Sequence, residues 1–383
     1  MENPRTAKRA ARPHLFSATR GVEVSLLALL AFIPVTLASE AGGLPPEVVF
    51  LFAAVAIIPL SALLGRATEE YAAHKGPAMG GFLNATLGNA TELIIALFAV
   101  YAGLFEIVKA SIAGSIIANL LLVFGGAVLI GGMRAPSLKL HEKGTHTALS
   151  MMTLSVIAMS LPALFYYSSL SPAVAQTLPA PLDPAEAAER LHALTLWTVA
   201  VMITVYGLGL VYSFVTHKHI FHEAAPGDGA VWSSRKALAV MGVATLGIAG
   251  MAEALVGSVE GLTRSLGLTE LFVGVVIVAI VGNAAEHSTA ILVAARGKMD
   301  LAFQIAAGSS TQIALFVTPV LVFVSFAIAT PMDLVFEIFE LFGIAVTVAV
   351  AYAVTLDRET NWFEGTLLLG VYVVICAVFF VHP

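Results

Sequence analysis

The sequence predicts an all-α polytopic membrane protein of about 11 transmembrane helices, in which one extra helix precedes two five-helix repeats of inverted topology. Its composition, its apolar runs and an internal repeat predict this class. Of the 383 residues, 58% are hydrophobic and 11% are charged, whereas soluble domains carry about 25% charged residues. The net charge of −6 offers no basic face for nucleic acid. A single cysteine, Cys376, excludes an intrachain disulfide.

Apolar runs long enough to cross a bilayer recur along the chain, with polar breaks between them. The runs cover 23–38, 48–70, 77–103, 107–132, 146–167, 191–215, 236–262, 270–295, 301–328, 334–355 and 362–381. The first run is short, contains Pro34 and follows a basic tail, so a cleaved signal peptide is an alternative for it.

The distribution of Lys and Arg predicts the orientation. If the N-terminus is inside, 16 of the 19 basic residues fall in inside segments or adjoining helix ends, and Lys109, Arg190 and Arg264 fall outside. Cytoplasmic loops carry such an excess of positive charge. We therefore expect a cytoplasmic N-terminus and an outside C-terminus in the cell's inner (plasma) membrane.

The chain contains a repeat with a constant spacing. GNATE at 88–92 and GNAAE at 282–286 lie 194 residues apart, and Gly114-Ser115 and Gly308-Ser309 keep the same offset. Because five helices are an odd number, the second copy enters from the opposite face, which is a common transporter design. Duplication that preserved only a glycine packing motif is the alternative, but packing alone requires no acid in each copy.

This repeat divides the chain into five parts. They are a cytoplasmic tail at 1–22, the extra helix and loop at 23–46, the first repeat at 47–217, a cytoplasmic linker at 218–235 and the second repeat at 236–383.

Each repeat places an acid in the middle of an apolar helix, Glu92 in one and Glu286 in the other. Because a lone charge at mid-bilayer costs about 2.5–3.5 kcal/mol, such residues usually face a cavity or pathway. Asn89 and Asn283 precede the glutamates by three residues and share their helical faces. Carboxylate and amide oxygens suit a hard cation such as Ca2+. The glycine four residues before each glutamate lets the helix loosen there. A glutamate held neutral by its neighbours is the structural alternative.

The helices that follow also carry polar pairs at helical spacing. Ser115 and Asn119 are four residues apart, and Ser309 and Gln312 are three apart. We expect their side-chain oxygens to complete the cation site. Interhelical hydrogen bonding is the alternative.

Further titratable residues flank the predicted site. Glu69 and Glu70 lie near the end of one span, Glu253 and Glu260 lie in a later span, and His287 follows Glu286. Proton relay or an ion vestibule is the functional interpretation, because histidine titrates near neutral pH. Solvated helix ends are the alternative for the acids.

Histidines also cluster in the linker, where His217, His219 and His222 lie near Glu223 and Asp228. This pattern favours a solvated loop over a metal or pH sensor.

HEKGTH at 141–146 resembles a zinc protease signature, which is the pattern of an enzyme. Its histidines are five residues apart, whereas two ligands on one helical face need a spacing of four. The chain also has no P-loop signature, so the predicted transport draws on an ion gradient. No cofactor is predicted.

Two signatures resemble those of the cation/proton exchanger (CAX) family of the Ca2+/cation antiporter superfamily. They begin GNATELIIALFAVYAG at 88 and GNAAEHSTAILVAARG at 282, and GRATEEYAAHKG at 65 is similar as well. The resemblance implies Ca2+/H+ antiport, with Glu92 and Glu286 as the cation site. It also implies vestibule acids at Glu69 and Glu253, and helices 3, 4, 8 and 9 around the site.

The chain departs from the family pattern in its short linker, which lacks an acidic stretch. Asn-Ala stands before each signature glutamate, whereas the signatures of Na+-coupled relatives place Ser/Thr and Pro there. This difference favours H+ as the counter-ion. Besides Ca2+, H+ and the lipid bilayer, a second copy of the chain is a possible partner. A Na+-coupled or broader-range exchanger for Ca2+, Mn2+ or Na+, and a passive cation channel, stay open as alternatives.

Overall fold

The structure is a computed structural model that describes residues 27–75, 77–170, 183–217 and 231–382. It is almost entirely helical, as predicted, and its strands are a pair of two-residue segments within those ranges. The predicted tail at 1–22 and most of the linker, including His219, His222, Glu223 and Asp228, lie outside the described residues.

The first part of the chain contains η1 (Leu29–Ala31), α2 (Phe32–Ala41), α3 (Pro46–Ala73), α4 (Pro77–Leu87), α5 (Ala90–Tyr101), α6 (Phe105–Ile117), η2 (Ala118–Val123), α7 (Phe124–Gly132), β1 (Leu138–Lys139), α8 (Glu142–Phe165), η3 (Tyr166–Leu170), α10 (Pro184–Val211) and η4 (Tyr212–Thr216). The second part contains α12 (Ser234–Leu266), α13 (Glu270–Phe272), η5 (Val273–Val278), α14 (Ala279–Gly282), α15 (Ala284–Ala295), α16 (Met299–Gln312), η6 (Ile313–Val317), α17 (Thr318–Ala327), α18 (Ile338–Thr355), β2 (Glu359–Thr360) and α19 (Trp362–Val381).

Most of each predicted apolar run is helical where it is described, but the run predicted at 334–355 becomes helical only at Ile338, and the runs at 77–103 and 270–295 are each interrupted. Among the described residues, nine helices are long and apolar enough to cross a membrane, or up to ten if the bent pair formed by 270–282 and 284–295 is one span. The helix at Leu29–Ala41 is shorter. The protein is therefore a multi-pass membrane protein, and the count of eleven stays a prediction.

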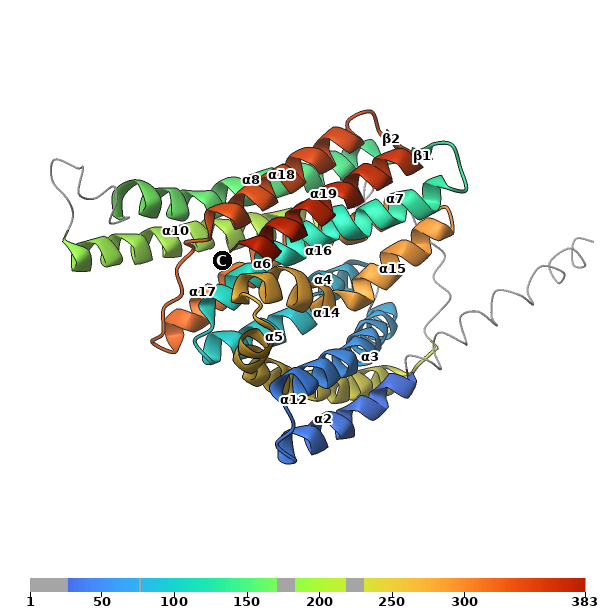
Figure 1. The fold of residues 1–383 in the computed structure, drawn as a ribbon. Helices are drawn as coiled ribbons and strands as arrows, with labels where there is room; N and C mark the ends of the chain where they lie inside the picture. The colour runs from blue at the N-terminus through green and yellow to red at the C-terminus, as the bar shows by residue number, and fades with distance from the viewer. Residues whose placement is uncertain (1–26, 76, 171–182, 218–230, 383) are drawn as a thin grey trace, which may run out of the picture.

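The long helices α3 and α12 pack along each other at one edge of the molecule, with α2 beside them (Figure 1). At the opposite edge, α7, α8, α18 and α19 form a second layer (Figure 1). Between these layers lie the helices that carry the paired motifs, α5, α6, α15 and α16. The arrangement keeps the polar motifs inside and leaves apolar side chains on the outer faces, where lipid is the solvent.

Two contacts join loops in pairs, and each pair is one that spans of alternating direction would put on the same side of the membrane. The β1 and β2 strands pair through Leu138 and Thr360, which joins the loops before α8 and α19. At a separate place, Lys109 Nζ donates to the Val335 carbonyl at 2.7 Å, which joins the start of α6 to the segment before α18. In both cases the joined loops were expected on one side of the membrane.

Candidate ion-binding site

Both motif helices are interrupted at the asparagine before the glutamate. Between α4 and α5, Asn89 adopts φ −99° and ψ 32°, and between α14 and α15, Asn283 adopts φ −92° and ψ 10°. The second interruption bends the helix by 60°. The expected loosening beside Gly88 and Gly282 is confirmed. Broken helices of this kind form ion sites in many transporters, because they expose polar backbone inside the membrane.

The helices with the second set of polar residues change their winding at the same level. The π-helical segment η2 begins at Ala118, three residues after Ser115, and η6 begins at Ile313, directly after Gln312. The two segments begin 195 residues apart, within one residue of the repeat offset of 194. Such π-helical insertions are frequent at functional sites.

Close backbone packing brings the two repeats together at this level. A Cβ at Gly114 of α6 would lie only 2.1 Å from the Val275 carbonyl oxygen of η5. Only a glycine lets these helices approach so closely. The contact places Ser115, the next residue, against the interruption at Asn283.

A buried hydrogen-bond network joins the asparagines and serines across the repeats. Asn283 Nδ2 donates to Ser115 Oγ at 2.9 Å, and Ser309 Oγ donates to Asn89 Oδ1 at 2.7 Å. These two pairs are related by the repeat offset. Asn119 Nδ2 connects them, since it donates to Ser309 Oγ at 2.9 Å and to Asn283 Oδ1 at 3.3 Å. All five side chains are buried, so each interruption is held by the opposite repeat.

Beside this network lies the buried carboxylate of Glu92, which is 7% exposed and has no hydrogen-bond partner at either oxygen. A Cβ at Gly282 would lie 3.2 Å from its Cγ, so the carboxylate packs against the interruption of the second repeat. Glu286 follows that interruption, four residues after Gly282. Asn119 Oδ1 and Gln312 Nε2 are buried and unpaired as well. The structure thus places Glu92 and the amides beside the two interruptions, and Glu286 lies on the helix that follows the second one.

The composition of this cluster fits a cation with oxygen ligands. Within the described ranges, no group of three or more His, Cys, Asp or Glu residues has the geometry of a metal site. A cation here would therefore bind a mixture of carboxylate, amide and backbone oxygens, which is the ligand set of Ca2+ rather than of Zn2+. Gln312 Oε1 lies over the other interruption, 3.4 Å from where a Cβ at Gly88 would be.

His287 follows Glu286 on α15, and its Nε2 is buried without a hydrogen-bond partner. Burial without a partner disfavours the charged imidazolium, so the relay role of His287 stays a prediction.

The acids of α3 lie away from the buried site, near the end of that helix. Glu69 is exposed, and Glu70 Oε2 accepts the backbone N–H groups of Val231 at 2.8 Å and Trp232 at 2.9 Å. Glu70 therefore fixes the chain that leads into α12.

The acids of α12 are likewise outside the buried cluster. Glu253 and Glu260 are exposed, and Glu260 pairs with Arg264 at 3.1 Å on the same helix. Their roles as relay or vestibule groups stay predictions. In such a role, these acids would act outside the buried cluster.

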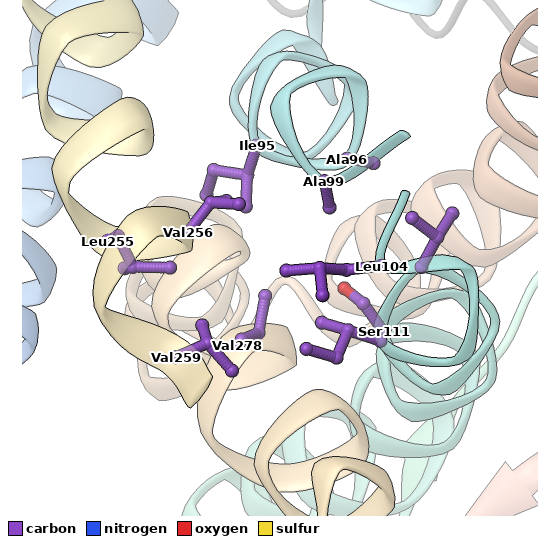
Figure 2. A pocket seen from close by; sticks show the side chains of 11 residues that line it. Ile95, Ala96, Ala99, Leu104, Ser111, Leu255, Val256, Val259 and Val278 are labelled. Carbon is purple, nitrogen blue, oxygen red and sulfur yellow. The ribbon is translucent and has the colours of Figure 1, made fainter. Parts of the chain in front are cut away.

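A small apolar pocket lies between α5, α6, α12 and η5 (Figure 2). Ile95 and Ala96, one turn beyond Glu92, project into it from α5, opposite Val256 and Val259 of α12. Val278, one turn before Gly282, lines its floor. Such apolar walls exclude water and strengthen electrostatic interactions nearby.

A hydroxyl pair beside the site was not among the predicted residues. Thr91 Oγ1 of α5 donates to Ser61 Oγ of α3 at 2.9 Å, and both residues are buried. The available signals were the place of Thr91 within GNATE and a serine in the middle of an apolar span. The pair ties the helix that carries Glu92 to α3.

The HEKGTH segment has a structural role. His141 precedes α8, its Nδ1 accepts the Gly144 N–H at 3.5 Å, and its own N–H donates to Asp300 Oδ1 at 2.9 Å. Because His141 lies outside the helix, it shares no helical face with His146.

A mostly helical membrane protein in which an unpaired carboxylate and unpaired amides lie between broken helices has the features of an ion transporter. Comparison with known proteins identifies the family. The family model described as sodium/calcium exchanger protein matches residues 47–215 and 236–381, and the chain belongs to this family.

The sequence is 42% identical over 374 residues to a protein of Aphanothece halophytica named Ca(2+)/H(+) antiporter, covering 93% of this chain and 96% of that one. It is 36% identical over 364 residues to Ca(2+)/H(+) antiporter ChaA of Bacillus subtilis (strain 168), covering 93% and 99%. The solved structure of native YfkE superposes with a TM-score of 0.77 at 35% identity, covering 93% of this chain and 99% of that one.

Proposed function

We propose that this protein is a secondary active antiporter that exchanges Ca2+ for H+ by alternating access. In this proposal the cation and the protons compete for Glu92 and Glu286. The names of its relatives support Ca2+/H+ exchange, and the chemistry of the buried cluster supports the residue assignment.

The observation that carries the proposal is the carboxylate of Glu92, which is buried without a hydrogen-bond partner and packs against Gly282, four residues before Glu286. A buried, unpaired charge is strongly destabilising, and two of them side by side also repel. A cation or protons relieve both penalties. The site is therefore built for exchange, since each ligand neutralises the same pair of groups.

Coupling follows from this competition. The Ca2+-loaded pair and the protonated pair are both close to neutral, so both can pass through a closed state inside the membrane. The empty, doubly charged pair is costly to bury, and this cost prevents uncoupled return. The apolar pocket beside Ile95 and Val256 supplies the water-excluding wall that such a closed state needs.

Asn89, Asn283, Ser115, Asn119, Ser309 and Gln312 are proposed to act in the same site. The hydrogen bonds among the asparagines and serines hold the two interruptions in register. Side-chain oxygens that keep free lone pairs, such as the unpaired Asn119 Oδ1, are available to a cation, which takes about 6–8 oxygen ligands.

Uptake of Ca2+ into inverted membrane vesicles under an imposed pH gradient tests the proposal. We expect uphill uptake that collapses when the pH gradient is dissipated. Vesicles with a Na+ gradient and clamped pH should take up almost none. Robust uptake there would establish the Na+-coupled alternative, and downhill flux alone under every gradient would indicate a channel.

A further inference from the structure

The interruption of the first repeat is contacted by a tyrosine from another helix. The Tyr206 hydroxyl of α10 donates to the Ala85 carbonyl of α4, four residues before Asn89. Tyr206 is 6% exposed. Its ring stacks on Phe316 of η6, with centroids 5.4 Å apart and an interplanar angle of 28°. It thus lies between the interruption that carries Asn89 and the π-helical segment that follows Gln312.

The equivalent carbonyl of the second repeat, Ala279, is satisfied differently. It accepts Asn283 Nδ2 at 2.9 Å and the Asn283 backbone N–H at 3.2 Å. Positions 85 and 279 are separated by the repeat offset of 194 residues. In the second repeat, the side chain of Asn283 therefore donates to this carbonyl. In the first repeat, a tyrosine from α10 donates to the equivalent carbonyl.

This difference changes how many hydrogen-bond positions remain free on each asparagine side chain. Asn283 Nδ2 donates to Ala279 and Ser115, and its Oδ1 accepts from Asn119. An amide has two donors and two acceptor positions, so both donors of Asn283 are engaged, along with one of its acceptor positions.

The Asn89 side chain makes fewer hydrogen bonds. Across the described part of the chain, its side chain makes one hydrogen bond, in which Oδ1 accepts from Ser309. An acceptor position therefore remains on its oxygen, beside the unpaired carboxylate of Glu92.

We propose that Tyr206 is a positioning residue for the ion site. By satisfying the Ala85 carbonyl, it releases Asn89 from the capping role that Asn283 performs, so that Asn89 is the asparagine that faces the cation. Asn283 is then a structural group. This inference rests on the proposed function, because it assigns roles within the same site.

Tyr206→Phe tests the inference, since it removes the hydroxyl and keeps the ring on Phe316. With the Ala85 carbonyl unsatisfied, Asn89 turns back to it, and we expect the apparent KM for Ca2+ to rise about fivefold to tenfold. The maximal rate should change less than about twofold. Tyr352→Phe, on an exposed tyrosine of α18, is the matched control and should leave both constants unchanged.

A double-mutant cycle separates this role from general stability. In an Asn89→Ala background, adding Tyr206→Phe should raise KM less than about twofold. Additive effects, or a Tyr206→Phe protein that does not fold, would overturn the inference.

Melting temperatures give a second readout. Asn283→Ala should lower the melting temperature more than Asn89→Ala does, whereas Asn89→Ala should weaken Ca2+ binding in a protein that stays folded. The reverse order would also overturn the inference. Wild-type vesicles in the same assay test Ca2+/H+ exchange itself, so failure of the proposed function is recognised separately.

Discussion

At the scale of single residues, the buried polar groups divide into those that satisfy one another and those that do not. Asn283 bonds to Ser115 and Asn119, Asn119 also bonds to Ser309, and Ser309 bonds to Asn89. Glu92 has no such partner. Since unsatisfied buried groups are rare in folded proteins, this carboxylate is the place where a ligand is expected.

Replacing either acid by glutamine tests this assignment. Glu92→Gln and Glu286→Gln keep the shape of the side chain and remove its charge, so we expect normal folding with Ca2+ uptake reduced to background in vesicles. Glu189→Gln, at an exposed position near the start of α10, is the control and should transport normally. A well-expressed Glu92→Gln or Glu286→Gln protein with near-normal flux would show that the cation binds elsewhere.

The competition between Ca2+ and protons gives a pH dependence with a definite sign. Protons bind the free carboxylates and Ca2+ displaces them, so apparent Ca2+ affinity should rise with pH and fall as the solution is acidified. Calorimetry on purified protein, in buffers of different ionisation enthalpy, counts the protons released on binding. A count near zero across about pH 6–8 would require a separate proton path, and His287 is the first residue to examine for it.

At the scale of elements, glycines set how closely the two repeats approach. The repeat-equivalent positions 114 and 308 differ here. A Cβ at Gly114 would collide with the backbone of η5, whereas a Cβ at Gly308 would meet nothing within 4 Å. The same motif therefore performs a packing function in one repeat and not in the other.

Gly114→Ala should consequently destabilise the protein while Gly308→Ala should not. Overpacking costs about 1–3 kcal/mol where neighbours can shift, and the neighbour here is backbone, which shifts less easily. Melting temperatures of the two purified variants provide the comparison. Equal melting temperatures would mean that α6 and η5 do not pack as closely as described.

Gly282→Ala addresses the interruption beside Glu92. The added methyl group would lie 3.2 Å from the Glu92 Cγ, so the flexible carboxylate must move by a few tenths of an ångström. We expect a folded protein whose apparent KM for Ca2+ is raised about threefold to tenfold. Gly370→Ala in α19, where no atom lies within 4 Å, is the control. An unchanged KM would indicate that the position of Glu92 is not critical.

At the scale of the whole molecule, the loops fall into two sets held together by their own contacts. The strand pair joins the loops before α8 and α19. Lys109 joins the start of α6 to the segment before α18, pairing with Glu106 at 2.8 Å and lying 3.6 Å from Asp333. Each set is expected on one side of the membrane.

Single cysteines in a Cys376→Ala background test that orientation. Positions within 134–145, 217–235 and 356–361 should react with an impermeant reagent from the cytoplasm only. Positions within 39–46 and 168–189 should react from outside only. Outside labelling of 217–235 would contradict the inverted repeat, because the second half would then cross the membrane in the wrong direction.

The class of the protein and its helical segments follow from the sequence, because lipid demands long apolar runs and leaves them visible in the chain. The repeat and its two glutamates are equally visible, since mid-membrane acids are costly and stand out. The interruptions at Asn89 and Asn283 could be expected from the adjacent glycines. The sequence does not separate the acids of the site from those at its periphery, such as Glu70 and Glu260.

Only the tertiary structure decided which polar groups meet. Ser115 bonds to Asn283, and Ser309 to Asn89, across well over a hundred residues of chain. Helical spacing says which face a residue occupies but not which helix that face opposes. For the same reason the role of Tyr206 could not be predicted. In the sequence it is an aromatic residue in an apolar span, and only the packing of the helices shows that its hydroxyl donates to the Ala85 carbonyl. Packing also decided the different roles of Gly114 and Gly308, because the space around a glycine is a property of its neighbours in the fold.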